Sequence, residues 1–333
     1  MPNDAIAAPA PMDTRITRLL GIRYPIVLGG LQGLGRAELA AAVSHAGGLG
    51  LITAGCFESR EELETEILGA RRLSNRPVGV NISIGSRRSM APFVDCACEM
   101  QVGIIFTSGN NPEAFVAQLK RHGVIWVHVA PSLRYARKAE ELGADAVVLV
   151  GFEAGGHPGK DDVALSVLVR KGSRELRIPV IAAGGISDGR SFAAALAWGA
   201  EGVQVGTRFV LSRESVLHPD LKAALLRATE HDTVLIERSL GKTRRVLRTA
   251  QAEAVLALER QGADFARLQH IIGGVAYLDT ILGGRTDRGV LSTGQCIGLL
   301  DDIPLAGDVV YSIAKEGRQM AERLQRAFSN ESR

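Results

Sequence analysis

The sequence alternates eight times between a short apolar run and an amphipathic stretch, and this alternation limits the fold more than any other feature. The runs are rich in β-branched residues and nearly continuously apolar, as is typical of parallel strands covered on both faces. Right-handed crossovers and a count of eight favour a closed (β/α)8 TIM barrel, an α/β fold, over an open sheet. The predicted strands are residues 25–30, 48–53, 77–83, 103–108, 124–130, 146–151, 179–184 and 202–209. Helices are expected at 36–45, 60–73, 91–100, 112–122, 133–142, 163–171 and 189–198.

Residues 213–282 break this rhythm, because their composition is helical and they carry no clear strand. We interpret them as a helical insertion, or cap domain, over the active site at the barrel mouth. A glycine-rich segment then leads to a final amphipathic helix at 305–328. The expected organisation is a flexible tail at 1–13, a barrel formed by 14–212 and 283–333, and the insertion at 213–282.

Composition excludes several classes of partner. Hydrophobic residues make up 46% and charged residues 23% of the 333, the balance of a soluble globular enzyme. The formal net charge of +3 argues against nucleic acid or an anionic membrane as partner. No apolar run approaches the roughly 18 residues of a membrane span, and the N-terminus lacks the pattern of a signal peptide. Four cysteines without zinc-ligand spacing indicate reduced thiols, so we expect a cytoplasmic protein without a metal; a homodimer is possible.

Two glycine motifs follow the last two predicted strands. Gly184 and Gly185 end strand seven, and Gly206 and Thr207 end strand eight. In TIM barrels a phosphate commonly binds between these two loops, where glycines let the backbone approach it closely. The alternative is that these glycines only form turns. Phosphate binding leaves FMN, a nucleotide monophosphate and a sugar phosphate open.

Small residues at other strand ends favour a flat ring across the barrel mouth. Gly29, Gly30 and Leu31 follow strand one, and Asn81 lies on strand three. An asparagine offers both a donor and an acceptor to the edge of such a ring. The pattern therefore favours a flavin among the phosphorylated ligands.

The loop after strand six holds one histidine among glycines. It reads GFEAGGHPG, with Gly155 and Gly156 directly before His157. Imidazole, with an ordinary pKa of about 6.5, takes or gives a proton at neutral pH, so His157 is the candidate catalytic base. The alternative is a hydrogen-bonded surface histidine. Glu153 in the same loop would orient a ligand or serve the structure alone, and His128 on predicted strand five is expected to be a hydrogen-bonded core residue.

These motifs together resemble the nitronate monooxygenase family, formerly called 2-nitropropane dioxygenases. The resemblance rests on GFEAGGHPG, PVIAAGGISDG, GVQVGTRF, PIVLGG, AELAAAVSHAGGLG and GRTDRGVLSTGQCIGLLDD, and covers nearly the whole chain. It implies an FMN-binding TIM barrel with a helical second domain over the active site. It also implies that His157 deprotonates a nitroalkane, and that FMN passes electrons from the nitronate to O2, giving a carbonyl compound and nitrite.

By the same resemblance, FMN contacts carry over onto a set of matching residues. They are Gly29, Gly30, Leu31, Asn81, Gly155, Gly156, Gly184, Gly185, Gly206, Thr207 and Gln295. The chain departs from the family at Leu28 and Leu31, where its members usually have Gln and Met beside the flavin. This departure puts the tuning of the flavin, and ordinary nitronate oxidation, in question.

The sequence is also similar to NAD(P)H:quinone reductases and to flavin-type enoyl-acyl-carrier-protein reductases, which take hydride from a nicotinamide. Strand five lacks the lysine that the quinone reductases carry beside the ring, which weakens that alternative. Three hypotheses result. The first is a nitronate monooxygenase using FMN, O2 and a small-molecule substrate. The second is an NAD(P)H-dependent reductase of quinones or enoyl thioesters, and the third is a barrel that binds a phosphorylated ligand without redox chemistry.

Overall fold

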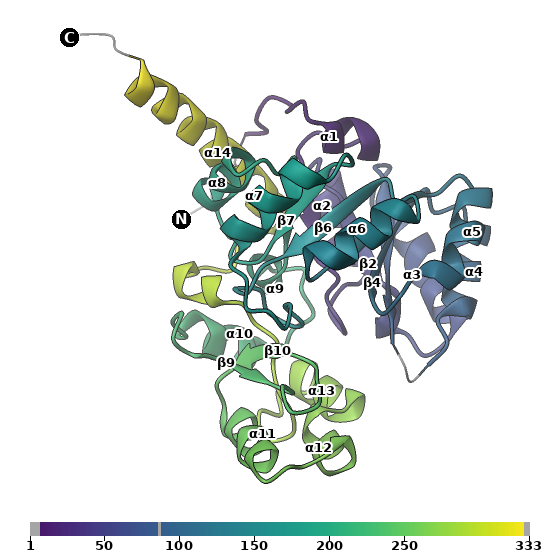
Figure 1. Cartoon of the computed structure of the whole chain (residues 1–333), viewed down its shortest axis with the longest axis vertical. Helices are drawn as coiled ribbons and strands as arrows, with labels where there is room; N and C mark the ends of the chain where they lie inside the picture. Colours follow the sequence, from purple (N-terminus) through teal and green to yellow (C-terminus); the bar gives the residue numbers. More distant parts are fainter. Residues whose placement is uncertain (1–6, 86–87, 330–333) are drawn as a thin grey trace.

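Eight parallel strands form a (β/α)8 barrel in the computed structural model, which describes residues 7–85 and 88–329 (Figure 1). This confirms the predicted fold class. The strands follow one another as neighbours around the sheet, and β1 pairs with β8. Their bounds are β1 (Ile26–Leu28), β2 (Gly50–Thr53), β3 (Val78–Ile84), β4 (Ile104–Gly109), β5 (Ile125–Ala130), β6 (Ala146–Val150), β7 (Val180–Ala183) and β8 (Gly202–Val205).

The barrel closes between β1 and the residues just before β2. Val27 and Leu49 form a parallel bridge there. The Leu28 amide donates to the Leu49 carbonyl at 2.8 Å, and the Leu49 amide donates to the Ile26 carbonyl at 2.9 Å. With β1 paired to β8 on its other side, the strand ends come together in a ring, as the barrel interpretation requires.

The eighth strand is shorter than predicted. It ends at Val205, whereas the apolar pattern predicts a strand to residue 209. The chain turns at Gly206 and enters a short helix, α9 (Thr207–Val210), whose four residues are all buried. The apolar pattern continues through this helix because it is buried, so hydrophobicity alone did not mark the end of the strand.

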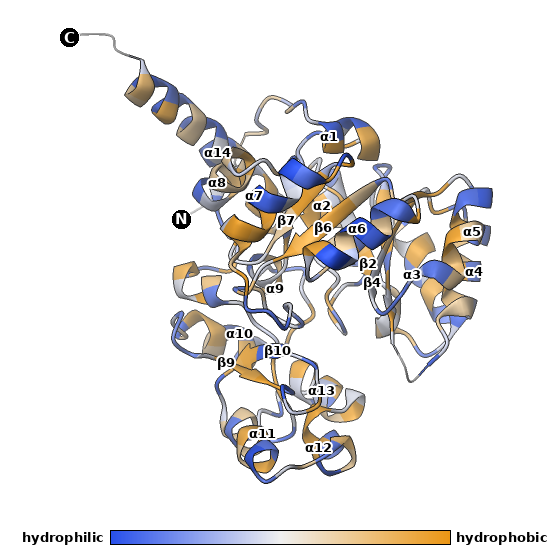
Figure 2. Ribbon diagram, viewed as in Figure 1, coloured by the Kyte–Doolittle hydropathy of each residue, from blue (hydrophilic) through white to orange (hydrophobic). Residues whose placement is uncertain are grey.

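Amphipathic helices cover the outside of the barrel, and their apolar faces turn toward the strands (Figure 2). Side chains of β-strands alternate in direction, so each strand serves two cores. Val27, Phe106 and Val148 belong to the core inside the barrel, which also contains Ile16 and Leu20 of the first helix. The helices are α1 (Arg15–Leu20), α2 (Ala37–His45), α3 (Arg60–Leu73), α4 (Ala91–Glu99), α5 (Glu113–Arg121), α6 (Leu133–Glu141), α7 (Leu165–Glu175), α8 (Gly189–Ala197) and α14 (Ala306–Phe328).

The predicted insertion contains a strand pair that the sequence reading missed. Thr233–Ile236 (β9) and Arg244–Leu247 (β10) pair antiparallel, whereas we expected no strand in this region. The RRVL segment of β10 carries two arginines and directly precedes a long helical pattern. For both reasons its sequence does not indicate a strand. The surrounding helices are α10 (Pro219–Leu226), α11 (Ala250–Arg260), α12 (Phe265–Ile272) and α13 (Gly274–Ile281).

These elements gather on one side of the barrel (Figure 1). A cluster of buried apolar side chains joins them to it, and contains Leu34 from the loop after β1 together with Leu221 and Tyr277 of the insertion. The packing reaches beyond residue 282, since the Leu247 amide donates to the Leu291 carbonyl at 2.7 Å. The division at residues 213 and 282 into separate domains stays a prediction.

The N-terminal segment is held from about residue 9, although we expected a flexible tail over 1–13. The Met12 amide donates to the Arg23 carbonyl at 2.9 Å, and Arg318 of α14 donates to the Ala10 carbonyl at 3.0 Å. Residues 1–6 of the predicted tail lie outside the described residues. None of the helices in the described ranges has the length and apolar character that a membrane crossing needs.

Candidate functional site

The loops after β7 and β8 form a cradle of free backbone donors. Gly184 and Gly185 have φ angles of 108° and 71°, which glycine adopts without strain. The amide N–H groups of Gly184, Gly185 and Gly206 have no hydrogen-bond partner among the described residues. The buried Ser187 hydroxyl next to them has none there either. Gly184, Gly185 and Gly206 are half-buried, so their amides can reach a ligand, and the arrangement fits an anion such as a phosphate.

Space for the anion is left on the side of β8. A Cβ added at Gly206 would meet only Leu31 Cδ2, at 3.6 Å. The Thr207 hydroxyl accepts from the Gly294 amide at 2.9 Å, and this bond leaves its own O–H available to donate. The structure therefore brings Gly184, Gly185 and Gly206 together, and it joins Thr207 to the segment before Gln295. The role of Thr207 in binding stays a prediction.

Asn81 and the loop after β1 supply the expected polar edge for a ring. A Cβ at Gly30 would lie only 2.5 Å from Asn81 Nδ2, so glycine is required beside this amide. Asn81 is 2% exposed, and its Oδ1 has no partner among the described residues. The Gly29 amide donates to the Val205 carbonyl at 2.8 Å, which joins this loop to the end of β8. The orphaned Oδ1 fits the donor edge of a flavin ring.

The histidine loop packs against the segment at 293–295. A Cβ at Gly155 would come within 2.5 Å of the Thr293 carbonyl carbon, so the loop and the 293–295 segment need glycine at their contact. The Gln295 amide donates to the Glu153 carbonyl at 3.0 Å. The Glu153 carboxylate accepts from the Leu165 amide at 3.1 Å, at the start of α7. This bond favours the structural role for Glu153 over an orienting one.

The His157 side chain is exposed, but the protein atoms around it still perturb its imidazole. Desolvation, with a smaller contribution from the positive charges of Arg244 and Lys242, lowers the pKa of this ring to about 4. The ring is therefore neutral at pH 7 and has a free site for a proton. His128, by contrast, is a buried core histidine whose Nδ1 lies 2.9 Å from the Thr107 hydroxyl.

The insertion contributes a wall that the sequence reading did not single out. Gly156 of the histidine loop forms an antiparallel bridge with Arg245 of β10. The buried Arg244 guanidinium lies 5.0 Å from the centre of the Tyr277 ring, and the Tyr277 hydroxyl donates to the Gln32 carbonyl at 3.0 Å. No local pattern signals this wall, because it depends on β10 pairing with a loop almost ninety residues earlier in the chain.

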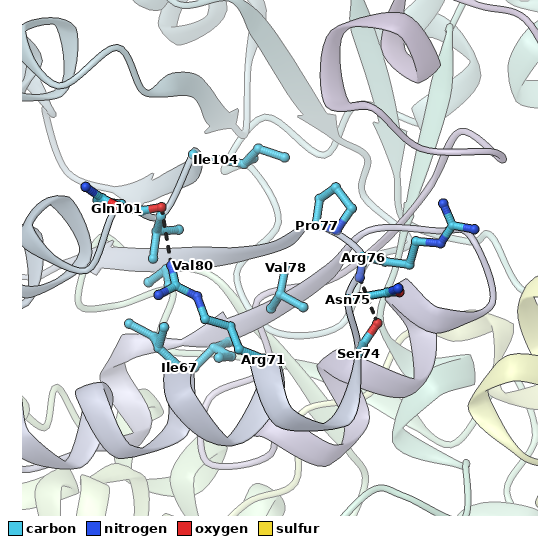
Figure 3. A pocket seen from close by; sticks show the side chains of 13 residues that line it. Ile67, Arg71, Ser74, Asn75, Arg76, Pro77, Val78, Val80, Gln101 and Ile104 are labelled. Carbon is cyan, nitrogen blue, oxygen red and sulfur yellow. Dashed lines mark hydrogen bonds between the residues drawn. The ribbon is translucent and has the colours of Figure 1, made fainter.

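A cavity of about 420 Å³ lies elsewhere, near the start of β3 and β4 (Figure 3). Arg71, Arg76 and Gln101 line its rim, and the Arg71 guanidinium donates to the Gln101 carbonyl at 3.3 Å. TIM-barrel chemistry takes place at the carboxyl ends of the strands, and this cavity is at the amino ends. It is therefore separate from the site around His157. The described residues contain no cluster of three or more His, Cys, Asp or Glu side chains that would hold a metal ion.

Comparison with known proteins links this geometry to one family. A family model described as nitronate monooxygenase matches residues 13–101 and 93–316. A probable nitronate monooxygenase of Staphylococcus aureus is 33% identical, over 75% of this chain and 82% of its own length.

Two further relatives align over more of the chain. The (3aS,4S,5R,7aS)-5-hydroxy-7a-methyl-1-oxo-octahydro-1H-indene-4-carboxyl-CoA dehydrogenase of Rhodococcus jostii is 30% identical, over 93% of this chain and 97% of its own. Among solved structures, FabK from Thermotoga maritima is 39% identical with a TM-score of 0.90, and the match covers 95% of this chain and 100% of that one.

Proposed function

Because the chain belongs to the nitronate monooxygenase family and is a flavin-dependent oxidoreductase, we propose that it binds FMN and oxidises alkyl nitronates with O2. The products would be a carbonyl compound and nitrite. The proposal commits to a substrate that carries its negative charge while it lies beside His157.

The observation that carries this proposal is the charge around His157. Its imidazole is neutral at pH 7, with the cations of Arg244 and Lys242 close enough to disfavour the imidazolium. The same two cations attract an anion, although Glu237 pairs with Arg244 and offsets part of its charge. A nitronate is such an anion and requires no base to form it in the site.

The residues present fit FMN as the flavin. The free amides of Gly184, Gly185 and Gly206 would hold the phosphate, with the Ser187 hydroxyl as a further donor. Asn81 would accept from the edge of the ring through its Oδ1. When bound, FMN supplies the electron acceptor for the substrate and the electron donor for O2.

His157 would act on neutral nitroalkanes rather than on nitronates. A neutral imidazole accepts a proton from carbon, but a base with a pKa of about 4 binds that proton weakly. We therefore expect preformed nitronates to react faster than the parent nitroalkanes. Leu28 stands where the family usually has a glutamine near the flavin, and Leu31 where it usually has a methionine. We therefore expect the reactivity of the bound flavin to differ from that in the family's usual members.

A second candidate function is redox chemistry on an acyl thioester, with NAD(P)H as the hydride source where the reaction is a reduction. The share of the chain that aligns favours this candidate. The alignment with the CoA dehydrogenase covers 93% of this chain, whereas the alignment with the Staphylococcus protein covers 75%. A thioester carbonyl that gains negative charge during reaction would benefit from the same two cations. The quinone-reductase form of this candidate lacks any such support.

One spectroscopic experiment separates the candidates. The absorbance spectrum of the purified protein is recorded, and NADH, NADPH, propyl-2-nitronate and an acyl-CoA are then added anaerobically in separate cuvettes. We expect a flavin spectrum that is bleached by the nitronate and unchanged by the nucleotides. Bleaching by a nucleotide or the acyl-CoA, with none by the nitronate, would replace the first candidate by the second. A colourless protein would contradict both.

A further inference from the structure

Arg244 lies near His157, because a backbone bridge joins the residues next to them in the chain. The Gly156 amide donates to the Arg245 carbonyl at 3.0 Å, and the Arg245 amide donates to the Gly156 carbonyl at 2.6 Å. These reciprocal bonds make Gly156 and Arg245 a hydrogen-bonded antiparallel pair, which brings the adjoining residues His157 and Arg244 near each other. The positive charge of Arg244 accordingly acts on the His157 imidazole.

The Arg244 guanidinium is fixed on several sides. Its Nε donates to the Ser292 hydroxyl at 3.2 Å, and its Nη1 lies 3.5 Å from both the Glu237 carboxylate and the Ile272 carbonyl. The side chain is also stacked near the Tyr277 ring and is only 8% exposed. Its Nη2 has no hydrogen-bond partner among the described residues. One end of a rigid cation is thus left for another acceptor.

In Arg245, the next residue, every guanidinium nitrogen donates a hydrogen bond within the protein. Its Nε and Nη2 donate to the Phe152 carbonyl at 3.3 and 2.9 Å, and its Nη1 donates to the Thr233 hydroxyl at 3.0 Å. All three nitrogens are therefore engaged within the protein. Arg245 fastens β10 to the histidine loop, whereas Arg244 retains a free donor on the opposite face of the strand.

The protein neutralises only part of the positive charge near His157. Glu237 pairs with Arg244, but Lys242 has no side-chain hydrogen bond or ion pair within the described ranges. Both cations act on the imidazole. A buried arginine with an unused donor, next to a second cation and a neutral histidine, is suited to hold an oxyanion.

We propose that Arg244, supplied by the insertion, binds a negatively charged oxygen of the substrate through Nη2 and holds that substrate against His157. This inference rests on the proposed function in one respect, namely that the substrate presents an oxyanion beside the histidine. It assigns the recognition of that oxygen to a residue outside the barrel, and it makes Arg244 a substrate-binding residue with His157 as the neighbouring base.

The experiment measures anion binding without turnover. Sodium nitrate, a planar oxyanion, is titrated into the purified holoprotein by calorimetry at pH 7. For Arg244→Gln we expect the Kd for nitrate to rise about 10- to 100-fold, the usual effect of losing a hydrogen bond to a charged group. An unchanged Kd in this variant, or no nitrate binding by the parent protein, would overturn the proposal.

Two matched variants separate recognition from structure. Glu237→Gln breaks the same buried ion pair but keeps the cation, so its Kd should stay within about threefold of the parent. Arg248→Gln removes one positive charge from the exposed end of the same region, where Arg248 pairs with Glu253, and should also leave the Kd unchanged. A loss in Glu237→Gln equal to that in Arg244→Gln would mean that the ion pair matters only for structure, and would overturn the proposal.

A third variant keeps the test decisive if Arg244→Gln does not fold. Lysine has a single charged tip, so Arg244→Lys cannot keep the Glu237 contact and an oxyanion contact in the same way as the planar guanidinium. We expect its Kd to rise about five- to tenfold, and we expect the variant to fold, because lysine keeps a positive charge beside Glu237. Full nitrate affinity in this variant would contradict the proposal. These experiments measure nitrate binding and not turnover. Their results can therefore be interpreted even if the protein does not oxidise nitronates.

Discussion

The two sides of the site differ in the groups that they present, which are backbone amides on one side and side chains on the other. The barrel side consists largely of backbone: free amides at Gly184, Gly185 and Gly206, and a glycine at position 30 that makes room for Asn81. The insertion side consists of long side chains, Arg244 and Tyr277, fixed by their own bonds. Backbone donors recognise a group that every member of a family shares, such as a phosphate. Side chains are free to vary, so the insertion is the side on which substrate choice can change.

The largest effect should come from charging the backbone side. In Gly206→Asp we expect flavin affinity to fall by roughly 1000-fold, because two negative charges about 4 Å apart repel by about 4 kcal/mol. The new side chain has room, since only Leu31 Cδ2 lies within 4 Å of the added Cβ. Flavin absorbance per mole of purified protein measures the loss.

Gly103→Asp is the matched control, since Gly103 precedes β4 at the other end of the barrel and a Cβ there meets nothing within 4 Å. Its flavin content should equal that of the parent. If Gly206→Asp also purified with full flavin, the phosphate would have to bind elsewhere, and the contrast between the two sides would fail.

Removing the histidine should have the next largest effect. In His157→Ala we expect kcat/KM for a neutral nitroalkane to fall about 100-fold, while a preformed nitronate loses less than about tenfold. The flavin should be retained, because no contact of the phosphate cradle involves this ring. Steady-state oxygen uptake with both forms of one substrate provides the comparison. Equal losses on both would argue against a base.

The pH dependence tests whether the insertion acts electrostatically on the barrel loop. The His157 pKa is lowered from its ordinary 6.5 to about 4, so the ring should stay neutral through pH 6. Since the unfolded chain binds this proton more tightly, the histidine destabilises the native state as pH falls below about 6.5. Carbon-13 NMR of labelled histidine should show no titration of His157 near neutrality.

In Arg244→Gln the His157 pKa should move upward, toward its ordinary value, because one of the two cations is gone. Arg248→Gln should leave the titration where it is. A His157 that titrates at about 6.5 in the parent protein would show that neither desolvation nor the insertion perturbs it.

The smallest effect is expected at the junction of the two sides. Tyr277→Phe removes the bond from α13 to the Gln32 carbonyl in the loop after β1. A single neutral hydrogen bond contributes about 1 kcal/mol, so the melting temperature should fall by about 2 °C. Differential scanning calorimetry with flavin present measures this. A fall several times larger would mean that the insertion also holds the β1 loop in shape.

The same contrast explains what the sequence could predict. Eight apolar runs such as 146–151 are local patterns, and each one marks a buried parallel strand without reference to the rest of the chain. Gly184 and Gly206 could be linked because the barrel topology alone brings the ends of strands seven and eight together. The fold therefore followed from the sequence, as did the position of these glycines at neighbouring strand ends, while their contact with a cofactor stays a prediction.

Elements whose form depends on distant partners could not be predicted in this way. β10 was missed because Arg244 and Arg245 look like exposed helix residues until β9 and the histidine loop pair on either side of them. The free amides and the orphaned Asn81 oxygen are likewise visible only once the strands are in register. The bond between the Thr207 hydroxyl and the Gly294 amide also joins residues that are far apart in the sequence.

The position of α14 in the chain has a consequence for folding during synthesis. This helix closes the barrel's outer layer: Glu316 accepts from the Gly189 amide at 2.8 Å, and Gly317 packs against Phe192 of α8. This helix is translated only after the whole insertion. All eight strands therefore emerge from the ribosome while the apolar faces of α2 and α8 are still uncovered. During that interval the nascent barrel exposes apolar surface that is prone to aggregation. The length of the insertion determines how long this surface stays exposed before α14 is synthesised.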